Sequence, residues 1–230
     1  MRLKGTTIVN KETLELLRTS DALIDDTTRF VYFTRGEEFQ KKAVSQLQEM
    51  RDALRNILAK EQSGKKTCAD TCNRIYGQIQ VYRAILGEIR MVLSLKEGDM
   101  DQAWDYLIDS QMAVTSAICA HPTYARGEMD DYGKRLHMIE EVVFPRQLFL
   151  STGYIVKSSK CSVCDSDYGE CNHIKGRVYN GRPCCRIVAD CDISEISIVE
   201  TPANKRCRAM HFGDGGKTMR NLMTWRKVSN

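Results

Sequence analysis

The stretch "PRQLFLSTGYIV" (145–156) marks the point where the sequence changes from a helical to a strand-like pattern. Before Pro145, apolar residues recur every three or four positions, which is typical of helices buried along one face. From Gln147 onward, aromatic and β-branched residues cluster between Gly, Pro and Asn turn signals, which is typical of strands. We therefore expect two domains, a helical one over residues 1–145 and a β-rich one over 146–230.

The helical half is predicted to form an antiparallel bundle. The segment 37–61 carries one apolar stripe, and further helices are expected over 67–96, 100–120 and 127–143, with a short capped helix over 10–25. The connections between them are short, so neighbouring helices should run antiparallel. The stripe of 37–61 comprises Phe39, Ala43, Leu47, Met50, Leu54 and Leu58.

The C-terminal part is too small to bury a thick core. Strands are expected over 147–156, 184–190, 193–200 and 206–212. A domain of this size gains much from a structural metal.

The two parts also differ in charge. The basic and acidic residues of the C-terminal part number 14 and 8, a net charge of about +6, whereas the first 145 residues carry 20 and 22, about −2.

The chain holds ten cysteines and shows no secretory signal at its start, "MRLKGTTIVNKE". No apolar run approaches the roughly 18 residues that would span a membrane. A cytoplasmic protein is the expectation, and there clustered cysteines are better explained as metal ligands than as disulfides.

Such a cluster lies in "CSVCDSDYGECNHIKG" (161–176), with the spacing Cys161-x2-Cys164-x6-Cys171-x-His173. Three thiolates and one imidazole are the donors of a tetrahedral Zn²⁺ site. Four other cysteines remain alternatives to a ligand of this set: Cys184, Cys185, Cys191 and Cys207.

The predicted zinc is structural. A catalytic zinc keeps one coordination position open for water and has a general base beside it, whereas four protein donors close the shell. A redox role for the Cys-x2-Cys pair would need a thioredoxin-like βαβ context, which the sequence lacks. The expected fold is thus α+β, an antiparallel helical bundle followed by a small zinc-stabilised β-rich domain.

The positive charge of the C-terminal part predicts contact with nucleic acid or with an acidic protein, although a solvated basic face is the plainer interpretation. Its candidate contact residues are Arg177, Arg182, Arg186, Lys205, Arg206 and Arg208.

Two segments, "FLSTGYIV" (149–156) and "EISIVETPANKR" (195–206), resemble the phage prohead (capsid maturation) protease family. The resemblance implies that Ser151 matches the family's nucleophile and that the zinc cluster is an insertion between two strands. The family's base histidine comes from a strand before the serine motif, where this chain is predicted to be helical. The second segment would be structural, through Glu195, Ser197, Val199, Pro202, Ala203 and Asn204.

Three functions are hypotheses at this point. The leading one is a non-enzymatic, zinc-binding adaptor subunit of a larger multi-protein assembly; the resemblance places that assembly in an anti-phage or phage-related system. The second is a serine peptidase that uses Ser151. The third is a zinc protein that binds DNA or RNA without sequence specificity, through phosphate contacts that weaken with salt.

Overall fold

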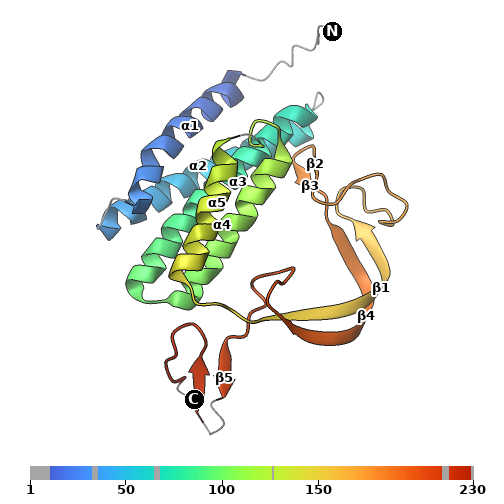
Figure 1. The fold of residues 1–230 in the computed structure, drawn as a ribbon. Coiled ribbons are helices and arrows are strands. Elements are labelled where there is room, and N and C mark those ends of the chain that lie inside the picture. Colours follow the sequence, from blue (N-terminus) through green and yellow to red (C-terminus); the bar gives the residue numbers. More distant parts are fainter. Residues whose placement is uncertain (1–10, 33–35, 65–67, 126, 214–217, 229–230) are drawn as a thin grey trace.

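The computed structural model describes residues 11–32, 36–64, 68–125, 127–213 and 218–228. Its N-terminal part consists of helices packed side by side (Figure 1). They are α1 (Lys11–Tyr32), α2 (Glu37–Ser63), α3 (Ala69–Glu97), α4 (Met100–Ala120) and α5 (Glu128–Val143). The predicted helices match these bounds closely except at the N-terminus, where α1 runs well beyond the expected 10–25.

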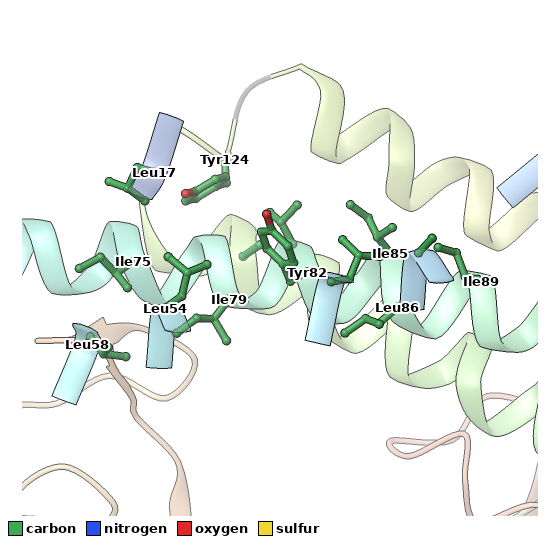
Figure 2. Close-up of a cluster of buried hydrophobic side chains, with 14 of the residues drawn as sticks. Leu17, Leu54, Leu58, Ile75, Ile79, Tyr82, Ile85, Leu86, Ile89 and Tyr124 are labelled. Carbon is green, nitrogen blue, oxygen red and sulfur yellow. The ribbon is translucent and has the colours of Figure 1, made fainter. Parts of the chain in front are cut away.

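Helix α3 is the centre of the bundle, because it packs against α1, α2 and α4. Figure 2 shows its apolar side chains meeting those of α2 and α1, and Tyr124, from the segment after α4, belongs to the same cluster. The helix is buried on nearly every side, which explains why its apolar residues are not confined to one stripe. Fully buried members of this core include Leu47, Leu54, Ile75, Tyr82, Leu86 and Ile89.

Helices α3 and α4 approach each other closely at Gly87. A Cβ atom at this position would lie 2.3 Å from Ser110 Oγ and 2.9 Å from the carbonyl oxygen of Tyr106. Ser110 Oγ in turn donates a hydrogen bond of 2.9 Å to the carbonyl of Ala84. Because glycine has no side chain, Gly87 allows α3 and α4, which carry most of the core, to pack this closely.

A charged pair ties α5 to this core. Glu88 of α3 is 1% exposed, and Arg135 Nη2 of α5 lies 2.8 and 3.0 Å from its two carboxylate oxygens. Tyr132 donates a further hydrogen bond of 2.6 Å to the same carboxylate. A buried carboxylate needs such partners, because an unpaired charge is costly away from water.

After Pro145 the chain forms antiparallel strand pairs. The long ribbon consists of β1 (Phe149–Cys161) and β4 (Arg186–Val199), paired from Phe149↔Val199 to Cys161↔Arg186. Two short pairs join β2 (Val178–Tyr179) with β3 (Arg182–Pro183), and β5 (His211–Gly213) with β6 (Met219–Asn221). The predicted α+β class, with five packed helices and then strand pairs, is confirmed.

Two strand predictions need correction. Most of the segments 184–190 and 193–200 belongs to one strand, β4, whose pairing with β1 shifts register at three places; Cys184, Cys185 and Glu200 lie outside it. Such bulges bend a strand without ending it, so the polar residues between the two apolar runs do not form a turn. Within 206–212 only the last two residues belong to a strand, β5; Arg208 forms an isolated bridge to Phe149.

The start of the ribbon is packed into a second apolar cluster around Trp104 of α4. Phe149 and Met223 are both buried there, and the rings of Trp104 and Phe144 meet edge to face with centroids 5.4 Å apart. Trp104 Nε1 also donates to the carbonyl of Lys205 over 3.1 Å. The helical and β-rich parts thus share a core, and their division into two domains at residue 145 stays a prediction.

The ribbon leaves the bundle at this cluster, bends, and returns toward α3 beside β2 and β3 (Figure 1). It is therefore attached to the helices at both of its ends. Among the described residues, every helix is too short or too polar to cross a lipid bilayer.

Candidate metal centre

The predicted ligands come together at the far end of the ribbon. One ligand atom each from Cys161, Cys164, Cys171 and His173 lies within 4.8 Å of every other. Three sulfurs and one nitrogen at this spacing can hold a metal ion such as zinc, which tetrahedral Cys₃His sites prefer.

A tight turn positions the first two cysteines. Cys161 ends β1, its carbonyl accepts a hydrogen bond of 2.9 Å from the Asp165 amide, and its own amide donates to Ser166 over the same distance. Asp165 has φ 59°, a left-handed conformation that Asp adopts more readily than most residues. The amide of Val163 points at Cys161 Sγ, 3.4 Å away. The turn therefore places the thiols of Cys161 and Cys164 on the same side of the chain.

The turn also favours thiolates. Burial raises the pKa of Cys161, but the amides of Cys164 and Val163, together with the side chains of Cys171 and Cys164, lower it to about 7. The amide and hydroxyl of Ser166 lower the pKa of Cys164. Burial has the opposite effect on Cys171, whose pKa is raised. N–H donors stabilise the form of sulfur that binds a metal.

The imidazole of His173 is suited to bind a metal ion. Its Nδ1 atom is buried, and no hydrogen bond to it is found within the described ranges. The imidazole is held against the ring of Tyr179, edge to face with centroids 4.6 Å apart. A buried nitrogen without a hydrogen bond is costly, and a metal ion beside three thiols would remove that cost.

The segment beyond His173 anchors the centre to the helices. Asn180 and Gly181, with φ of 51° and 71°, connect β2 to β3 in the manner of an Asn-Gly hairpin turn. Asn73 of α3 accepts a hydrogen bond of 2.8 Å from the Gly181 amide and donates one of 3.1 Å to the carbonyl of Val178. Gln62 of α2 donates to the carbonyl of Asn180 over 2.8 Å.

We predict that Gly181→Ala detaches this hairpin from the helices. A Cβ atom at Gly181 would lie 2.7 Å from Leu58 Cδ1 and 3.1 Å from the Cys72 carbonyl, and the positive φ adds strain. The expected cost is about 2–4 kcal/mol, from about 1–3 kcal/mol of overpacking and about 1 kcal/mol of backbone strain. Urea unfolding measures this cost. Hydrogen exchange of the α2 and α3 amides that face the hairpin shows whether the hairpin has detached.

Gly176→Ala is the matched control. Gly176 has φ 86°, but a Cβ there would meet no atom within 4 Å, so only the strain of about 1 kcal/mol remains. Equal effects of the two substitutions would show that the hairpin tip does not pack on the bundle.

A fourth cysteine, Cys184, lies beside the centre and is one of the four alternatives from the sequence. Cys184 is 1% exposed, and its Sγ lies 3.9 Å from Cys161 Sγ. Burial and the Cys161 sulfur raise its pKa to about 11. The remaining alternatives, Cys185, Cys191 and Cys207, are all exposed.

The predicted basic contact residues fall into two groups. Arg177, Arg182 and Arg186 are exposed near the metal centre. The other three form ion pairs with the helices: Lys205 Nζ lies 2.6 Å from Glu140, Arg208 Nη2 lies 2.5 Å from Asp101, and Arg206 contacts Asp109. Arg208 is buried. These pairs hold the chain after β4 against α4 and α5.

Ser151 lies in the middle of the resemblance to the prohead proteases. The two resembling segments pair with each other as β1 and β4, with Ser151 directly opposite Ser197. Ser151 is half-buried, and within the part of the chain that the structure describes no hydrogen bond joins its hydroxyl to a histidine. Among the described residues, Ser151 therefore has no hydrogen-bonded histidine of the kind that activates a serine nucleophile.

Comparison with known proteins returned no match, whether to a family model, to a curated protein or to a solved structure. The resemblance to the prohead protease family stays a prediction. A function for this chain therefore rests on the geometry and chemistry of its own residues.

Proposed function

We propose that this chain is a zinc-binding accessory subunit that presents a β-ribbon to a protein partner within a larger assembly. Zinc closes the turn at the end of the ribbon, the hairpin fixes that turn to α2 and α3, and the Trp104 cluster fixes the other end. The metal is structural in this proposal, because four protein donors leave no position open for a substrate.

The observation that carries the proposal is an exposed apolar face on the ribbon. Cross-strand neighbours share a face, and the register places Leu150 opposite Ile198 and Tyr154 opposite Ile193. We call this set the ribbon face; its members and their exposed fractions are Leu150 45%, Tyr154 51%, Ile193 70%, Ile196 68% and Ile198 71%.

A set of this kind is unusual on a protein that has no partner. Single exposed apolar residues are normal, whereas contiguous exposed apolar patches larger than roughly a few hundred Å² are rare on monomeric proteins and mark sites of interaction. The ribbon face lies opposite to the side that carries the buried Phe149, so the bundle does not cover it. Among the described residues, β1 and β4 pair with each other alone over most of their length, which leaves backbone groups free along their outer edges. An apolar strand of a partner protein fits both features.

Site-specific photo-crosslinking in the cells that express the chain tests the proposal. A photoreactive residue at Ile196 or Ile198 should give one discrete product, identifiable by mass spectrometry, that disappears when Ile193 is replaced by lysine. The control position is Val142 of α5, which is 85% exposed and is not part of the ribbon. No product from the ribbon positions, or the same products from Val142, would overturn the proposal.

Ser151→Ala separates this function from the peptidase alternative. We expect the substitution to leave the crosslinked product and the metal content unchanged, because the hydroxyl has no basic partner to activate it. We also expect no labelling of the wild-type protein by a fluorophosphonate. Labelling that Ser151→Ala abolishes would instead establish the serine as a nucleophile.

A further inference from the structure

Resting on the proposed zinc centre, we propose that Cys184 is a reserve ligand that takes the place of His173 on the metal. Four donors of the centre lie within 4.8 Å of one another, and the Cys184 sulfur lies 3.9 Å from one of them, Cys161, whereas zinc in structural sites is bound by four donors. One of these donors must therefore lie outside the coordination shell of the zinc ion while the other four bind it.

The distance between Cys161 and Cys184 is that of two ligands of one ion. Two sulfurs that each lie about 2.3 Å from a tetrahedral zinc are about 3.8 Å apart. The observed separation is 3.9 Å, and both side chains are buried. It is also far longer than the about 2.05 Å of a disulfide.

The backbone of Cys184 is hydrogen-bonded to the segment that follows His173. Its amide donates to the carbonyl of Arg177 over 2.8 Å, and its carbonyl accepts from the amide of Gly176 over 2.9 Å. Both partners follow His173 within four residues, so the backbone holds Cys184 against the segment that follows the imidazole. Exchange of one for the other would require movement of side chains rather than a new arrangement of the chain.

The charge of the surroundings favours the exchange. Three thiolates, a neutral imidazole and Zn²⁺ sum to −1, and replacing the imidazole by a fourth thiolate gives −2. Arg177, Arg182 and Arg186 lie on either side of Cys184 in the chain and bring positive charge to this end of the ribbon. In the exchange, the sulfur–zinc bond forms as the nitrogen–zinc bond breaks, and the thiol proton passes to water.

Cobalt titration of four proteins tests the inference: wild type, His173→Ala, Cys184→Ala, and the variant with both substitutions. We expect the wild type and each single variant to bind about one Co²⁺ per chain, with the affinity of His173→Ala lowered by no more than about tenfold. The variant with both should bind at least a hundredfold more weakly than His173→Ala. The sulfur-to-cobalt charge-transfer band of His173→Ala should be stronger than that of Cys184→Ala, because four sulfurs then bind instead of three.

The neighbouring thiol supplies the control. Cys185 is exposed, so Cys185→Ala should change nothing in the wild type and nothing further in His173→Ala. The inference is overturned if His173→Ala alone releases cobalt, or if removing Cys184 from it has no more effect than removing Cys185. A wild-type chain that binds no metal would overturn the zinc centre itself. Helical circular dichroism verifies that each variant is folded.

Discussion

Replacing Cys161 and Cys164 together with serine is expected to abolish metal binding and to unfold the segment from Cys161 to Cys184, while the helices remain folded. At most three donors then remain at the centre, too few for a closed structural site. Because the binding energy of a structural zinc, about 10–16 kcal/mol in small domains, is also folding energy, its loss should be decisive for so small a segment.

Elemental mass spectrometry and hydrogen exchange measure the two effects. The metal content should fall from about one ion per chain to none, and the amides of the turn after Cys161 and of the β2–β3 hairpin should lose their protection. The matched control is Cys191→Ser with Cys207→Ser, which removes two exposed cysteines outside the centre. A metal-free variant that keeps full protection of the hairpin would show that the metal does not hold this part of the fold.

Trp104→Ala is expected to cost about 3–5 kcal/mol of unfolding free energy, as is usual for a fully buried tryptophan. The indole is 2% exposed and packs against Phe144 and Phe149, so its loss leaves a cavity at the joint between helices and ribbon. The Lys205 carbonyl would also lose its hydrogen-bond donor.

Urea unfolding compares this variant with Trp225→Ala. Trp225 is 61% exposed and contacts mainly Phe212, so its removal should cost about 1 kcal/mol or less. The Trp104 variant should also free the start of β1, seen as faster exchange of the Leu150 amide, which otherwise donates to Cys207 over 2.7 Å. Similar costs for the two tryptophans would contradict the placement of Trp104 in a shared core.

The sequence predicted those features that depend on residues close together in the chain. The helices could be predicted because their stripes repeat locally, and α3 begins and ends within two residues of its expected bounds. The metal cluster could be predicted because four donors lie within thirteen positions.

Features that depend on distant residues could not be predicted. Arg208 was expected to be a surface cation, since nothing near it in the chain reveals Asp101, which is 107 positions away. The closeness of Cys184 to Cys161 arises only once the Asn180–Gly181 turn folds the chain back. The exposure of the ribbon face was hidden for a different reason: alternating apolar residues indicate a face to be buried, but not whether this chain or another protein buries it.

The attachment of the ribbon at both ends has a consequence for the order in which the chain folds. The contacts of α2 and α3 with the hairpin join residues more than 100 positions apart, such as Gln62 with Asn180 and Asn73 with Gly181. Closing such long loops is slow compared with forming helices, so we expect the bundle to form early and the ribbon to dock late. During synthesis, Trp104 would emerge long before Met223, and its apolar surface would stay open to the chaperones of the cell until the last strands arrive.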